Sequence, residues 1–159
     1  MSIVSTQIDI IVVNSAIILL SLLDNLIDLV VDSLSLYLDL KEVKLDRHCF
    51  ISIISLYVLS RKKIYLINIH RLEKIVFSIT NSSTISLKII LESSTIFKVI
   101  FDIRNDSDVL FSHYKIFVDD IKDLQLMKLA TRKDSKNFVA ELVKCIEKNS
   151  SVSIAAKAK

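Results

Sequence analysis

The chain has 159 residues, of which 52% are hydrophobic, 21 are basic and 18 are acidic. This length suits one domain with a sizeable core, and this composition excludes a disordered ground state for the whole chain. A net charge of +3 permits a nucleic-acid partner without requiring one. The sequence contains no Gly and no Pro, although tight turns and helix ends commonly need Gly.

The first 30 residues are the most apolar part of the chain. Residues 10–23 carry no charge, but the run is shorter than the ~20 residues that a membrane-spanning helix needs. No basic segment precedes it, as a signal peptide would require. We therefore expect a buried strand over residues 8–13, then a helix from the N-cap Ser15 to about Val30, and no membrane association.

Three strands are expected next, over residues 34–40, 50–59 and 64–69, because these segments are rich in β-branched and aromatic residues. Only short polar turns separate them, which favours an antiparallel three-strand meander.

Helical and strand patterns alternate in the second half of the chain. A strand over 98–103 precedes a helix over 106–114, for which Asn105 is the expected N-cap, and residues 149–159 form a frayed tail. The order predicts an α/β fold, in which the antiparallel meander and later parallel strands form a mixed sheet flanked by helices. The other expected elements are helices over 72–77, 86–92, 123–132 and 137–148 and a strand over 116–118.

The cysteines and histidines give no sign of a metal or disulfide framework. Cys49 and Cys145 are far apart, no CxxC occurs, and the three histidines lack zinc-ligand spacing. This favours an intracellular location, in the cytoplasm or nucleus.

Three segments resemble the RNase D-like 3'–5' exonucleases of the DEDD superfamily. SLYLDLKEVKLDRH (35–48) resembles the first exonuclease motif, and KVIFDIRNDSDVLFSHYKI (98–116) resembles the second. DDIKDLQLMKLATR (119–132) resembles the segment after it, where the family has Asp-Thr-Gln. The pattern is most similar to the fungal 3'–5' exonuclease domain-containing group. It implies an RNase H-like fold with a five-stranded mixed sheet, nucleic acid (DNA or RNA) as the partner, and two-metal phosphodiester hydrolysis with Mg²⁺ or Mn²⁺.

The resemblance places Asp39 at the first carboxylate position and Lys41 where the family has Glu. An ammonium cannot ligate a metal ion. Glu42 is adjacent, but strand alternation is expected to turn it to the other face of the sheet. The first motif therefore supplies one candidate ligand instead of two.

The acid of the second motif is Asp106 or Asp108. The spacing to Lys115, where relatives carry Gly, favours Asp106, whereas the apolar run over 109–111 favours Asp108. Asp39, Asp106 and Asp108 are thus the candidate catalytic residues and metal ligands that the resemblance implies.

The family's last element, Tyr-x₃-Asp, does not occur in the sequence, so residues 8–148 are expected to be a partial exonuclease domain whose C-terminal part is missing. The missing Gly and Pro, and Lys in place of Glu, are all reachable by C→T or G→A transitions, the footprint of repeat-directed hypermutation. We expect a degenerate copy, a 3'–5' exonuclease-domain protein with impaired catalysis and metal binding. The alternatives are a non-catalytic nucleic-acid-binding remnant and a decayed reading frame without function.

Three other polar residues are expected to have ordinary structural roles: Lys98 and Arg104 on a solvated face, and His113 packed on a helix. Asp123 is either a helix N-cap or a site residue.

Overall fold

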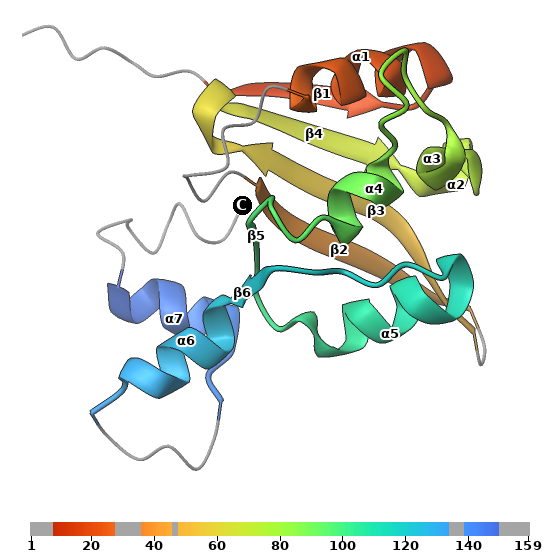
Figure 1. Ribbon diagram of the computed structural model, residues 1–159. Helices are drawn as coiled ribbons and strands as arrows, with labels where there is room; N and C mark the ends of the chain where they lie inside the picture. The colour runs from red at the N-terminus through yellow and green to blue at the C-terminus, as the bar shows by residue number, and fades with distance from the viewer. Residues whose placement is uncertain (1–7, 28–35, 46–47, 134–138, 150–159) are drawn as a thin grey trace, which may run out of the picture.

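The computed structural model describes residues 8–27, 36–45, 48–133 and 139–149 (Figure 1). A six-stranded mixed sheet carries α1, α4 and α5 over one face, while α6 and α7 lie together beyond the β6 end of the sheet. The strands are β1 (Asp9–Val13), β2 (Leu36–Leu45), β3 (His48–Val58), β4 (Lys63–Asn68), β5 (Lys98–Ile100) and β6 (Ile121–Asp123). The helices are α1 (Ala16–Leu26), α2 (Ile69–Leu72), α3 (Ile75–Ser78), α4 (Leu87–Glu92), α5 (Ile103–Tyr114), α6 (Leu124–Thr131) and α7 (Leu142–Asn149), with a 3₁₀ turn, η1 (Leu59–Arg61), before β4.

The sheet has the order β1-β4-β3-β2-β5-β6. β3 pairs antiparallel with both β2 and β4, which confirms the predicted meander. β5 runs parallel to β2, and β1 and β6 pair parallel with β4 and β5. The predicted α/β class with a mixed sheet is therefore confirmed, with six strands where the resemblance implied five.

The core lies between the sheet and the helices on its covered face. α1 buries one side of its surface, at Leu19, Leu22, Leu23 and Leu26, a helical spacing that the sequence already indicated. Along β2, the alternate residues Leu36, Leu38 and Leu40 are buried in the same core. The residues between them project from the opposite face of the sheet.

The start of α5 differs from the prediction. β5 ends at Ile100, and α5 begins at Ile103 with Asp102, not Asn105, as its N-cap. The Asp123 carboxylate explains the early start, because it accepts hydrogen bonds from the backbone nitrogens of Asp102 (3.2 Å) and Ile103 (3.3 Å). These bonds satisfy N–H groups that a helix start leaves without partners.

The predicted strand over 116–118 is wrong. The N–H of Phe117 bonds to the Glu92 carboxylate, and that of Asp119 bonds to the Leu91 carbonyl. This segment is therefore hydrogen-bonded to the end of α4 and not to a strand. The last strand forms further on, as β6.

Two predicted helices also have different bounds. The segment over 72–77 forms two short helices, α2 and α3, because Glu73 between them has φ 51° and ψ −142°, which no helix accommodates. α7 begins at Leu142, later than predicted. Parts of four predicted segments lie outside the described residues. They are the end of the first predicted helix and the start of the 34–40 strand (residues 28–35), the start of the last predicted helix (134–138), and most of the predicted tail (150–159).

Left-handed backbone occurs at six described residues, none of which is Gly. They are Lys62, Glu73, Thr84, Asp102, Lys115 and Asp120. A side chain with a Cβ is disfavoured in this conformation. The turns of the fold are thus formed without the residue that suits them best, including at Lys115, where the resemblance predicted Gly.

No helix among the described residues is long and apolar enough to cross a membrane. The 10–23 run is instead divided between β1 and α1, as predicted. The prediction that the strand is buried is wrong, because β1 lies at the edge of the sheet and Asp9, Ile10 and Val12 are exposed.

Candidate acidic site at the carboxyl end of the central strands

The candidate site lies where β2 and β5 end their pairing. Leu38 pairs with Ile100, the last residue of β5, so Asp39 follows directly at the carboxyl end of this parallel pair. α5 begins three residues after Ile100 and carries Asp106 in its first turn. Parallel pairing therefore brings residues from the two predicted motifs to one edge.

Asp39 and Lys41 form an ion pair on the exposed face of β2. The distance between Lys41 Nζ and Asp39 Oδ2 is 2.8 Å, and the two side chains are 64% and 53% exposed. The strand period of two explains the pairing, since both residues project from the same face. The predicted first ligand is thus paired with the ammonium that replaces the expected Glu.

Glu42 lies on the other side of β2, half-buried, as strand alternation predicted. A β-bulge falls next to it: Lys41 pairs with Ile53 and Glu42 with Ile51, so Ser52 is the extra residue of β3. The Ser52 hydroxyl donates to the Lys41 carbonyl at 2.8 Å and stabilises the bulge. Bulges redirect side chains, and this one lies where a second carboxylate is needed.

Asp106 is the acid around which the other charges gather. Burial, followed by the negative charges of Glu42, Asp39 and Asp102, raises its pKa to about 7, and Lys41 partly offsets the increase. The candidates Asp39 and Asp106 therefore lie close enough to interact. The sequence analysis dismissed Glu42 because of strand alternation. The structure instead gives Glu42 the largest effect of any charge on Asp106.

Asp108 does not share this environment. It is exposed, whereas Asp106 is half-buried, and two residues along a helix turn a side chain to a different side. Of the two acids that the sequence left open, the geometry favours Asp106 as the member of the acidic cluster.

Asp102 and Arg104 border the site at the N-terminus of α5. Arg104 donates to both Asp102 oxygens, from Nε at 2.7 Å and from Nη2 at 3.0 Å. This hydrogen bonding lowers the pKa of the Asp102 carboxyl. Arg104 also donates to Gln125 Oε1 at 3.2 Å. Arg104 is therefore exposed, as expected, but it is also hydrogen-bonded to two other side chains. Asp102 was not predicted, although an acid directly after a strand that pairs with β2 is a usable signal.

Two residues near the site have structural roles. Asp123 caps α6, as expected, through the backbone nitrogens of Gln125 (2.8 Å) and Leu126 (3.3 Å). The prediction for Lys98 is wrong, because its side chain is fully buried. Lys98 donates to the Asp119 carbonyl at 2.6 Å and also to the Ser93 carbonyl.

The arrangement does not fit a pair of divalent cations. Among the described residues, no group of three or more His, Cys, Asp and Glu side chains is placed to hold a metal ion. One oxygen of Asp39 is paired with Lys41, and Asp106 is about half protonated near pH 7. The arrangement of Asp39, Glu42, Asp102 and Asp106 instead favours binding of a proton by Asp106.

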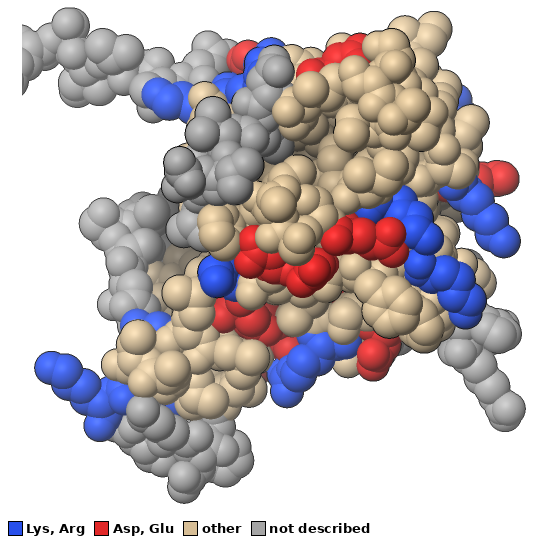
Figure 2. Space-filling model, in the orientation of Figure 1, with Lys and Arg blue, Asp and Glu red and all other residues tan. Residues whose placement is uncertain are grey.

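Charged side chains do not form one continuous basic surface in the view of Figure 2. Lys and Arg lie in separate groups, and a band of acidic side chains crosses the middle of this face. This agrees with the small net charge of +3.

Similarity to known proteins is found in structure and not in sequence. No family model and no curated protein sequence matches the chain. RNase D from Trypanosoma brucei, solved in complex with RNA U12, matches with a TM-score of 0.75 and 18% identity over 96% of this chain and 51% of that one. The fold is that of RNase D-like 3'–5' exonuclease domains.

Two further structures support this assignment. RNase D from Escherichia coli matches with a TM-score of 0.64 and 20% identity over 90% of this chain and 34% of its own. The EXD2 exonuclease domain, in crystals soaked in Mn, matches with a TM-score of 0.57 and 20% identity over 77% and 59%. The chain thus spans about half the length of the Trypanosoma RNase D that it matches, and the likeness confirms the RNase D-like fold that the sequence motifs implied.

Proposed function

We propose that this chain is a 3'–5' exonuclease-type domain that binds nucleic acid strands and whose hydrolytic centre is impaired. The observation that carries the proposal is the placement of Asp39, Glu42 and Asp106 around one edge of an RNase D-like fold, with Lys41 paired to Asp39. The fold supports the nucleic-acid partner, because the Trypanosoma RNase D was solved with RNA U12.

The impairment follows from the number of ligands more than from charge repulsion. Lys41 is mostly exposed, so water screens its charge, and its ion pair with Asp39 is worth only about 0–1 kcal/mol. The carboxylates are the larger obstacle. Two cations ~3.5–4 Å apart need carboxylate oxygens on both. Here Lys41 replaces one acid, and among the described residues no group of three or more His, Cys, Asp and Glu side chains is placed to hold a metal ion.

A second candidate is an active nuclease in which Glu42 replaces the missing acid at position 41. It is favoured by one observation: Glu42 has the largest effect of any charge on the pKa of Asp106.

Binding and hydrolysis are tested separately. Fluorescence anisotropy with labelled 12-nucleotide single strands of RNA and DNA should show binding that weakens as salt increases. The absence of binding at low salt would contradict the proposed partner. Metal-dependent release of nucleotides that is lost in Glu42→Gln, but kept in the matched surface variant Glu141→Gln, would favour the second candidate.

A further inference from the structure

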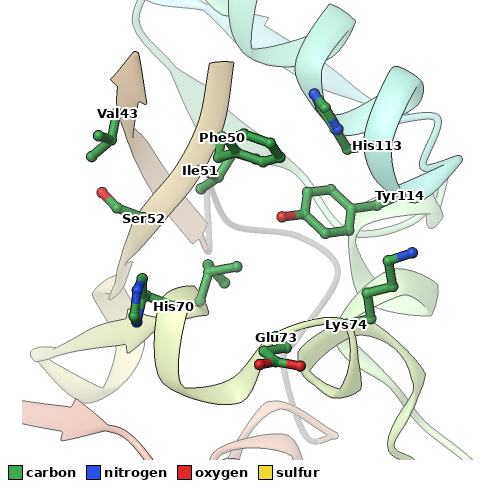
Figure 3. Close-up of a pocket in the computed structure, with 10 residues that line it drawn as sticks. Val43, Phe50, Ile51, Ser52, His70, Glu73, Lys74, His113 and Tyr114 are labelled. Atoms are coloured by element: carbon green, nitrogen blue, oxygen red, sulfur yellow. The ribbon is translucent and has the colours of Figure 1, made fainter. Parts of the chain in front are cut away.

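A separate cavity lies at the opposite end of α5 from the acidic cluster. Its volume is about 630 Å³, within the usual range of ~300–1,000 Å³ for small-molecule sites. It opens between the end of β2, the start of β3, the α2–α3 turn and the end of α5 (Figure 3). Asp106 and Tyr114 are eight residues apart on α5, or about 12 Å along the helix axis, so the two sites are distinct.

One side of the cavity consists of aromatic rings. The ring centroids of Phe50 and His113 are 5.1 Å apart, and those of His113 and Tyr114 are 6.2 Å apart. Phe77, which does not line the cavity, packs on Tyr114 with a distance of 4.5 Å between the ring centroids and holds the Tyr114 ring in place. Aromatic faces of this kind stack on planar ligands.

Ser52 is paired with the Lys41 carbonyl, but four other polar side chains of the cavity have no such partner among the residues that the structure describes. Within the described part of the chain, no hydrogen bond or ion pair involves the side-chain polar atoms of His70, Glu73, Lys74 or Tyr114. Figure 3 shows the Tyr114 hydroxyl directed into the cavity, with Glu73 and Lys74 along the same rim. Burial raises the pKa of Tyr114, so the hydroxyl stays protonated and available as a donor.

The base of the cavity is apolar. Ile51 and Ile69 are 3% and 2% exposed, and the more exposed Val43 extends the apolar lining. An apolar base, aromatic walls and a few convergent polar groups are the features of a preformed ligand site.

We propose that this cavity binds a nucleotide, with the base stacked on Phe50 and Tyr114 and the phosphate beside Lys74. The Glu73 carboxylate can accept a hydrogen bond from an amino group of the base, and the Tyr114 hydroxyl can donate to a ring nitrogen or carbonyl. Both charges at the rim are thereby used, which a purely apolar ligand would not achieve. The site does not depend on hydrolysis, since none of its residues belongs to the acidic cluster.

The test is calorimetric titration of the full chain with AMP and UMP. Binding should weaken at least fivefold in each of Phe50→Leu, Lys74→Gln and Tyr114→Phe. It should be unchanged in the matched controls Lys62→Gln and Tyr57→Phe, which lie outside the cavity, and in Asp106→Asn. Circular dichroism confirms that each variant is folded, and NMR shifts of the Tyr114 ring on adding AMP give a readout that needs no variant.

A single strand of six adenosines distinguishes a free nucleotide from a nucleotide within a strand. If the strand displaces AMP, the cavity holds one residue of a bound strand; if AMP still binds at saturating strand, the cavity takes the free nucleotide. Either result supports a nucleotide site. No AMP or UMP binding together with an unshifted Tyr114 ring, or binding lost only in Asp106→Asn, would overturn it.

Discussion

The Asp123 carboxylate accepts a hydrogen bond from the backbone nitrogen of Asp102 at 3.2 Å, although the two residues belong to different helix starts. The same carboxylate bonds to Ile103, Gln125 and Leu126, so one acid caps both α5 and α6. It thereby fixes the first turn of α5, which carries Asp106.

Asp123→Ala should lower the free energy of unfolding by about 2–4 kcal/mol, because four N–H groups, one buried and three partly buried, lose a charged acceptor. Urea denaturation measures the change. Asp108→Ala removes the same charge from an exposed position of α5 and should change stability by less than ~0.5 kcal/mol. Equal effects of the two substitutions would contradict the double-cap role.

Lys98, the first residue of β5, connects the segment before β5 to the segment before β6. Its fully buried ammonium donates to the carbonyls of Ser93 and Asp119, and burial lowers its pKa. Lys98→Met keeps the length of the side chain but leaves both carbonyls without this donor. We expect a loss of about 2–3 kcal/mol in unfolding free energy, compared with almost none for exposed Lys62→Met. An unchanged urea midpoint for Lys98→Met would show that the contacts carry no net stability.

The left-handed residues give a prediction in the opposite direction. Glu73→Gly and Lys115→Gly should each raise stability, by about 1 kcal/mol, because Gly removes the Cβ conflict at φ 51° and 54°. Thermal denaturation followed by circular dichroism measures the gain. Ser112→Gly, inside α5, is the control and should cost about 1 kcal/mol. A loss of stability in both left-handed variants would contradict the explanation.

Asp106 should make the stability of the fold depend on pH. Its folded-state pKa of about 7 lies above the ~3.9 of an unfolded Asp, so the folded state binds the proton more tightly. The favourable contribution is fully present below pH ~4 and is lost as the pH rises through 7.

Asp106→Asn should therefore be more stable than the wild type at pH 8, by about 1–2 kcal/mol after allowance for solvent screening, and the difference should vanish near pH 4. Urea unfolding across this pH range gives the comparison, with Asp108→Asn as the control. A wild-type advantage at pH 8 would show that Asp106 is stabilised as an anion.

The sequence predicted the elements whose pattern is local and periodic. α1, the meander and the Asp123 cap are examples, because apolar spacing and capping residues act over a few positions. It did not predict the early start of α5 or the loop over 116–118, since both depend on acceptors from distant segments, the carboxylates of Asp123 and Glu92.

The candidate site was predictable in part for the same reason. The motifs indicated Asp39 and either Asp106 or Asp108, and the proximity of the two motifs follows from the parallel pairing of β2 and β5. The role of Glu42 could not be predicted, because its charge acts on Asp106 across the fold, beside a bulge that no residue pattern indicates. The choice between Asp106 and Asp108 likewise needed the burial that only the fold provides.

Restoring the family's acid at position 41 is expected to be insufficient for activity. Lys41→Glu places Asp39 and a Glu on one face of β2, but Asp106 keeps a raised pKa of about 7 and remains a weak metal ligand. Without metal, the added negative charge should raise the pKa of Asp106 further, because Lys41 now lowers it. NMR titration of the Asp106 carboxyl measures this shift, and Lys62→Glu, outside the cluster, serves as the control. A lower pKa in Lys41→Glu would contradict the assigned cluster.

Release of 3'-terminal nucleotides from end-labelled RNA and DNA strands, at increasing Mg²⁺ or Mn²⁺, is the most direct test of the impaired hydrolytic centre. For the wild type and for Lys41→Glu, we predict no metal-dependent release above that of Asp106→Asn. Robust metal-dependent release by the wild type, abolished by Asp39→Ala, would contradict the account.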